Sequence, residues 1–261
     1  MNMKNVILVH KAGPRIARSE GVSEQHSLIQ SLVLHLFPGL CVLAFGFLAT
    51  HFVIQAGFPG TLALLLSALL IGTPLRLGYL LYQGKKQHGV FSLQGIVLYW
   101  GRMPWWQYLL ILLPIMVYAI ALEVLLSPVN SFPLTHMFWW LPPALLPSGA
   151  VTSLTTATLI TALLAVLIDG IVVPVVEEVY YRGYLLPRLS RLGWLAPVVN
   201  VLLFTLGHFW QPYNYLLIFL LVLPEVYLVY WKRNIKISIL IHCTANTLGA
   251  VLTLVALFMT R

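Results

Sequence analysis

Long apolar stretches, separated by short polar connections, dominate this sequence. A helix needs about 20 mostly apolar residues to cross the hydrocarbon core of a bilayer. Only 8% of the residues are charged, whereas a soluble domain carries about 25%. The composition therefore predicts an all-α transmembrane bundle that crosses the membrane several times. Seven stretches are expected to span it: 27–55, 60–82, 106–126, 155–180, 195–210, 214–231 and 237–258.

The basic residues alternate between connections and predict the orientation of the bundle. Connections with Lys or Arg alternate with connections that have none, and Lys and Arg favour the cytoplasmic side. This pattern predicts a cytoplasmic N-terminus and an outer C-terminus. We interpret the net charge of +8 as topology anchors in contact with the bilayer, and we expect no nucleic-acid partner. The basic groups are Lys4, Lys11, Arg15 and Arg18; Lys85, Lys86 and Arg102; Arg182, Arg188 and Arg191; and Lys232, Arg233 and Lys236.

Three regions follow from these spans. Residues 1–26 are predicted to form a cytoplasmic tail, residues 27–150 the N-terminal transmembrane helices, and residues 151–261 a C-terminal transmembrane core. Between Phe132 and Gly149 the chain is apolar but holds four prolines, which disfavour a regular helix. We therefore expect an outer interfacial loop there, with an eighth span as the alternative.

Acidic residues in apolar stretches are functional candidates, because a charge in the hydrocarbon core costs several kcal/mol. Glu177 and Glu178 are adjacent, and neighbouring helical residues point ~100° apart. Glu178 is four residues before Arg182 and is expected to form an ion pair with it. Glu177 then has no local partner and is a candidate general base. Both carboxylates could instead be solvated at the cytoplasmic end of a helix. Asp169 and Glu225 are further acids in apolar segments.

Two histidine motifs occur on later stretches. His208 follows Phe204 by four residues late in the fifth stretch, and His242 precedes Asn246 by four in the last stretch. Glu177, His208 and His242 form a set that can hold zinc with an open position for water. Without metal, the same residues can perform acid–base hydrolysis with Asn246 as an oxyanion donor. No organic cofactor is expected.

A lone histidine in an apolar helix is usually a hydrogen-bonded core residue. We interpret three others in that way: His35, His51 and His136.

At these motifs the sequence resembles the CAAX-protease and bacteriocin-processing (CPBP) family of intramembrane proteases, also called Abi or type II CAAX prenyl endopeptidases. The family shows EExxxR, FxxxH and HxxxN motifs in this order, and all three occur between residues 150 and 258. The resemblance implies an endopeptidase that hydrolyses a membrane-associated peptide or protein.

The resemblance also implies roles for the motif residues. Glu177 and His208 would activate water, while His242 and Asn246 would stabilise the oxyanion or bind metal. Glu178 and Arg182 would support the site. Both a metalloprotease and a glutamate protease fit the family. For the motifs to converge, the helix of Glu177 must continue to about Leu189, which places Glu177 near mid-membrane with access from the cytoplasmic half.

Two other functions fit the same residues. One is a non-catalytic bacteriocin-immunity or scaffolding relative that retains the motifs for structure. The other is an ion-coupled transporter with a relay through Asp169, Glu177 and Glu225. The sequence shows no repeat between its halves, whereas many transporters have one, so the enzyme is favoured. The compact size suggests a bacterial cytoplasmic membrane; the oligomeric state is left open.

Overall fold

The computed structural model describes residues 24–139 and 153–259, and helices make up nearly all of the regular structure there. The α-helices are α1 (Leu28–Gln55), α2 (Thr61–Ser67), α3 (Thr73–His88), α4 (Trp105–His136), α5 (Thr156–Leu167), α6 (Val173–Glu178), α7 (Leu195–Leu206), α8 (Tyr215–Lys232) and α9 (Lys236–Met259). Tighter or wider helical turns are η1 (Ala68–Gly72), η4 (Ile168–Val172), η5 (Val179–Leu185), η6 (Leu186–Leu192) and η7 (Pro212–Asn214).

Six helices in the described part of the chain are long and apolar enough to cross a membrane. The predicted polytopic helical bundle is therefore confirmed. The six are Leu28–Gln55, Thr61–His88, Trp105–Ser127, Thr156–Leu192, Pro212–Lys232 and Lys236–Met259.

The seventh predicted stretch, 195–210, differs from expectation. Its helix α7 has only 12 residues and ends at Leu206, so it spans about 18 Å at 1.5 Å per residue. Gly207 caps the helix, and a polar segment with Pro212 follows before α8 begins. The chain thus turns back before α7 could cross the hydrocarbon core. His208, predicted inside a span, lies in this turn instead.

Helix α4 also corrects a prediction. It continues through Ser127 and Pro133 to His136, past the predicted end of the span at residue 126 and into the loop that was expected from Phe132 onward. Proline is tolerated in long membrane helices because neighbouring groups compensate for the lost backbone hydrogen bond. The rest of the predicted interfacial loop, and the alternative eighth span, fall largely on residues 140–152, outside the described residues.

The helix that carries the two glutamates is continuous from Thr156 to Leu192, 37 residues in all. This confirms that it runs past Glu177 to about Leu189. It is not uniform, because π-helical turns interrupt it at η4 and η5. Such turns free backbone carbonyls from the regular pattern and often occur at functional sites.

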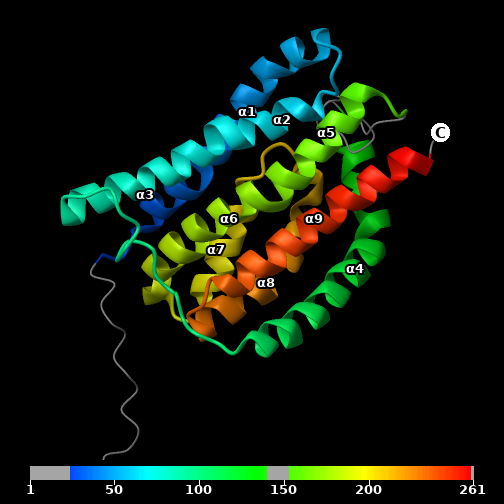
Figure 1. Cartoon of the computed structure of the whole chain (residues 1–261). Coiled ribbons are helices and arrows are strands. Elements are labelled where there is room, and N and C mark those ends of the chain that lie inside the picture. Colours follow the sequence, from blue (N-terminus) through cyan, green and yellow to red (C-terminus); the bar gives the residue numbers. More distant parts are fainter. Residues whose placement is uncertain (1–23, 140–152, 260–261) are drawn as a thin grey trace, which may run out of the picture.

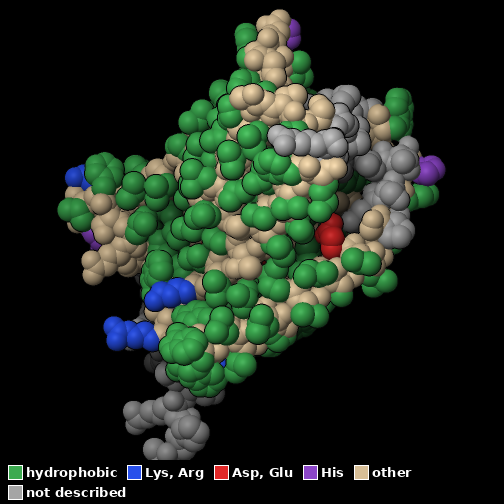
Figure 2. Space-filling model, turned by 45° about the vertical axis from the view of Figure 1, so that its right-hand side comes forward, with side chains coloured by type: hydrophobic (Ala, Val, Ile, Leu, Met, Phe, Trp, Pro, Cys, Tyr) green, Lys and Arg blue, Asp and Glu red, His purple; other side chains and the backbone are tan. Residues whose placement is uncertain are grey.

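The bundle is arranged around this long helix (Figure 1). Helices α1 to α3 lie on one side, and α8 and α9 lie on the other with α4 beyond them. The core is formed by the η5 and η6 segments, including Tyr180 and Leu185, packed against apolar residues of α7, α8 and α9. The outer surface is mostly hydrophobic (Figure 2), as expected for a surface that faces lipid.

Candidate active site

A cavity of about 510 Å³ lies inside the bundle, and all four predicted catalytic residues line it. This volume is within the usual range for small-ligand sites. The residues come from three separate segments: the long helix, the turn after α7, and α9. The structure thus brings together Glu177, His208, His242 and Asn246.

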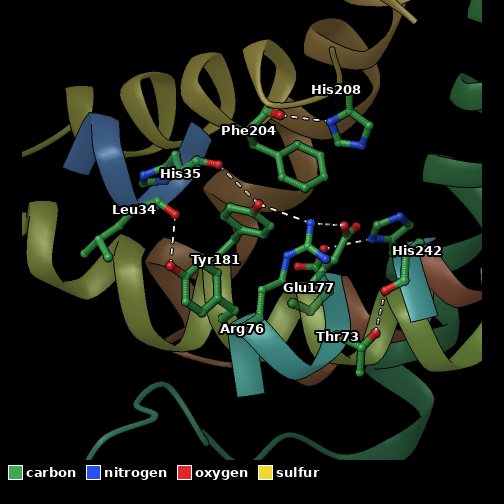
Figure 3. A network of polar contacts seen from close by, with 12 residues as sticks. Leu34, His35, Thr73, Arg76, Glu177, Tyr181, Phe204, His208 and His242 are labelled. Carbon is green, nitrogen blue, oxygen red and sulfur yellow. Dashed lines mark hydrogen bonds and ion pairs between the residues drawn. The ribbon is translucent and has the colours of Figure 1, made fainter. Parts of the chain in front are cut away.

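Glu177 lies on the cavity wall and is only 4% exposed. Its partner is Arg76 of α3, whose Nη2 lies 2.9 Å from Glu177 Oε1. Figure 3 shows Arg76 reaching toward Glu177, with Tyr181 on one side and His242 on the other. The expected lack of a local partner holds along the helix, but a distant segment supplies the counter-charge.

Glu178 is fully buried and forms the predicted ion pair. Its Oε2 lies 3.3 Å from Nε of Arg182, one turn later. Its other oxygen, Oε1, lies 2.9 Å from Nδ1 of His242. The Arg182 guanidinium also stacks over the Phe204 ring at 4.1 Å. The three motifs are therefore joined physically, with Glu178 and Arg182 at their centre.

His208 stands in the turn after α7, and one of its ring nitrogens is already engaged. Nδ1 lies 2.9 Å from the carbonyl oxygen of Phe204. Because that oxygen can only accept, Nδ1 carries the hydrogen and Nε2 of the neutral ring keeps a lone pair. The ring packs against Phe204 and Trp210. This packing fixes the histidine although it lies outside a helix.

His242 and Asn246 share one face of α9, as predicted, and the π-helical turn η4 anchors that face. Asn246 Nδ2 donates to the carbonyl oxygen of Asp169 at 3.1 Å, and Thr247 donates to the carbonyl of Gly170 at 3.1 Å. A side chain at Gly170 would meet Thr247 Oγ1 at 2.7 Å, so glycine permits the close approach. An amide NH₂ has two donors, and one N–H of Asn246 remains for a ligand.

The three histidines expected outside the site lie elsewhere. His35 is buried, with Nδ1 2.7 Å from the Ser31 carbonyl oxygen and Nε2 3.0 Å from Asn200 Nδ2. This is the hydrogen-bonded core position that the sequence predicts. His51 and His136 are exposed, and neither lines the cavity.

The predicted zinc ligands share the cavity but do not meet. Among the described residues, no three His, Cys, Asp or Glu side chains are close enough to hold a metal ion. Glu177 is engaged by Arg76, and Nδ1 of His242 by Glu178. As arranged, these side chains do not fit a zinc ion.

Two buried charged residues at the cavity were not assigned a role from the sequence. Arg76 is 2% exposed and Glu225 is 3% exposed, and both line the cavity. The rule that singles out acids in apolar stretches applies equally to a cation, so it could have identified Arg76 in the stretch 60–82. Glu225 was singled out only as an acid in an apolar segment and as a relay residue in the transporter alternative; it lies buried on the cavity wall from α8.

Comparison with known proteins agrees with the motifs. Residues 159–248 match the family model described as type II CAAX prenyl endopeptidase Rce1-like. The matched segment contains all three motifs, so the resemblance is confirmed, whereas Arg76 lies outside it. No curated protein and no solved structure matches the chain.

Proposed function

We propose that this protein is an intramembrane endopeptidase of the glutamate type. Its substrate is a membrane-associated peptide or protein. The proposal starts from two findings: residues 159–248 match the Rce1-like CAAX prenyl endopeptidase family, and six helices of the described chain are long and apolar enough to cross a membrane. One observation carries the proposal: a carboxylate, two imidazoles and an amide from separate segments line one cavity inside the bundle. Isolated polar groups at this depth would be costly to retain without a function.

The first chemical step is the activation of water by Glu177 and His208. The Glu177 carboxylate and the free Nε2 of His208 are both acceptors on the cavity wall. A water between them loses a proton to this pair as its oxygen attacks the scissile carbonyl carbon. The same proton then passes to the leaving amine as the C–N bond breaks. Atoms and charge balance with water as the only co-reactant.

His242 and Asn246 act on the other side of the cavity. The remaining N–H of Asn246 donates to the carbonyl oxygen as it becomes negative. The Glu178 carboxylate accepts the Nδ1–H of His242 and stabilises positive charge on that ring. Nε2–H of His242 is then a second donor to the oxyanion. Glu178 and Arg182 support the site without touching the substrate.

The proposal includes the orientation of the protein. We propose that it lies in a bacterial cytoplasmic membrane with the N-terminus in the cytoplasm. The short helix α7 and the longer helix α8 pack against each other and form a hairpin. The 12 residues of α7 bring the chain from the cytoplasmic side to a depth of about 18 Å. This depth agrees with a cavity near mid-membrane that His208 and Glu177 both line.

The test is cleavage by the purified protein in lipid nanodiscs. An internally quenched peptide library, read by fluorescence and mass spectrometry, reports any hydrolysed bond. Glu177→Gln keeps an oxygen for Arg76 but loses the base, so turnover should fall by about 10²–10⁴-fold. His51→Gln, outside the cavity, is the matched control and should cleave normally. Normal turnover by Glu177→Gln would show that Glu177 is not the base, whereas no cleavage by the unchanged protein would favour a non-catalytic relative.

A further inference from the structure

Arg76 is a buried cation supplied to the site by α3, outside the family-like segment. Its side chain is 2% exposed, and Nη2 lies 2.9 Å from Glu177 Oε1. The same nitrogen lies 3.4 Å from the hydroxyl oxygen of Tyr181, whose ring is 5.4 Å from the guanidinium carbon. One nitrogen thus connects Arg76 to the long helix at two neighbouring turns.

The local sequence makes room for this guanidinium. A side chain at Gly72, one turn earlier, would meet Nη1 of Arg76 at 2.8 Å. Gly72 ends the π-helical turn η1, a distortion that changes the direction of the following residues. In contrast, a side chain at Gly78 on the same helix would meet nothing within 4 Å. The space at Gly72 therefore accommodates the Arg76 guanidinium together with Val42, whose Cγ2 a side chain there would also meet at 2.8 Å.

The partner of Arg76 distinguishes it from the other buried arginine of the site, Arg182. Both arginines have buried donors without a hydrogen-bond partner among the described residues, so unpaired donors do not separate them. Arg182 pairs with Glu178, which does not line the cavity, whereas Arg76 pairs with Glu177, which does. The ion pair of Arg76 goes to one oxygen of Glu177. The other carboxylate oxygen is left for the cavity.

We propose that Arg76 is a positioning residue for Glu177. It holds Oε1 so that Oε2 faces the water and the scissile bond. The inference rests on the proposed function, and it extends the working site to α3, beyond the segment that the family model covers. Arg76 does not touch the reacting atoms.

Four variants separate positioning from folding. Arg76→Gln should lower kcat by about 100-fold, because a displacement of about 1 Å at a reacting group costs that much. KM should stay within about 3-fold, because binding does not depend on the carboxylate's orientation. Arg76→Lys retains the charge and should recover about one tenth of normal kcat. Gly72→Ala should lower kcat with Arg76 still present, whereas Gly78→Ala should not.

Thermal unfolding gives a second readout that needs no substrate. Arg76→Gln leaves Glu177 buried without its counter-charge, so its Tm should fall. The double variant Arg76→Gln with Glu177→Gln removes that charge and should recover much of the Tm. This recovery is measurable even if the single variant folds poorly. A double variant less stable than Arg76→Gln would contradict a direct pairing.

The two proposals fail in different ways. If Glu177→Gln is inactive but Arg76→Gln keeps kcat within 2-fold, the positioning role is wrong and the protease remains. If Arg76→Lys is no more active than Arg76→Gln, charge-based positioning is also wrong. If neither the unchanged protein nor any variant cleaves the peptide library, the proposed function fails. The Tm comparison then still decides whether Arg76 and Glu177 are coupled.

Discussion

Glu177 and Glu178 are neighbours on one helix and almost equally buried, yet their surroundings differ. Glu178 is enclosed by Arg182, one turn away, and by His242 of α9. Glu177 faces a cavity and is held on one side by Arg76 of α3. Both residues of the first pair lie within the family-like segment, and one partner of the second lies outside it.

The comparison shows how one helix can serve structure and chemistry at the same point. A carboxylate with both oxygens engaged is fixed and shielded, and it joins the motifs together. A carboxylate with one engaged oxygen is fixed but still open to a ligand. The ~100° between adjacent side chains is sufficient to separate these roles. The two glutamates should therefore respond differently to substitution.

The largest effect is expected at Glu178, the carboxylate with both oxygens engaged. Glu178→Ala leaves Arg182 buried and unpaired and also removes the acceptor for His242. Breaking a buried pair in this way costs about 3–5 kcal/mol, so folded yield and Tm should fall strongly. Arg182→Ala should behave alike, while Glu177→Gln, whose amide oxygen still accepts from Arg76, should lower Tm much less. Equal Tm values for the Glu178→Ala and Glu177→Gln proteins would remove the distinction between the two glutamates.

The next effect is expected in the cavity that Glu177 faces, at the groups that donate to the oxyanion. Asn246→Ala removes one donor, and loss of such a donor lowers kcat by about 10²–10³-fold. Its hydrogen bond to the Asp169 carbonyl is also lost, at a cost of only about 1 kcal/mol. Activity should therefore fall far more than stability. Thr247→Val, which removes the neighbouring bond to Gly170, is the matched control and should retain most activity.

A smaller effect is expected where α1 supports the turn that holds His208. A side chain at Gly39 would collide with the carbonyl oxygen of Gly207, directly before His208. Gly39→Ala should displace the turn, lower Tm by the equivalent of about 1–3 kcal/mol, and reduce kcat about 10- to 100-fold. Gly249→Ala on α9, where a side chain meets nothing within 4 Å, is the control. An unchanged kcat for Gly39→Ala would mean that His208 is not held by this contact.

The sequence predicts the surroundings of Glu178 far better than those of Glu177. The Glu178–Arg182 pair follows from a four-residue spacing on one helix, and helical geometry alone brings such residues together. The continuation of that helix past Glu177 follows from the need for the motifs to converge. These are local or nearly local relations, and the structure confirms them.

The Arg76–Glu177 pair could not be read in the same way. Its two residues belong to different spans, and only the packing of α3 against α6 brings them together. The place of His208 was also predicted wrongly, because apolar composition continues beyond Leu206 while the helix ends at Gly207. Composition reports which residues tolerate lipid, but not where the backbone turns back.

The smallest effect tests whether both glutamates are independent of the end of the bundle where α1 begins. His26, just before α1, packs against Tyr184, and its backbone N–H donates to the Arg188 carbonyl oxygen at 3.0 Å. Burial, with a smaller contribution from the nearby Arg188 charge, lowers the pKa of His26 from 6.5 to about 4. When the segment around His26 is released from the bundle, the His26 ring binds a proton below pH 6.5. When the segment is docked against Tyr184 and Arg188, the ring binds that proton only near pH 4.

Docking of this segment should thus be complete above pH 6.5 and weaken as the pH falls toward 4. The loss should appear as local opening and not as a lower Tm, because the short segment can detach without unfolding the bundle. Hydrogen exchange at His26 from pH 7 to 4.5 measures it, and His26→Phe, which cannot titrate, should stay protected throughout. The difference in Tm between the Glu178→Ala and Glu177→Gln proteins should not change with His26→Phe. If it does, the end of the bundle that holds His26 is coupled to the site, and the contrast between the two glutamates is not set by their immediate partners alone.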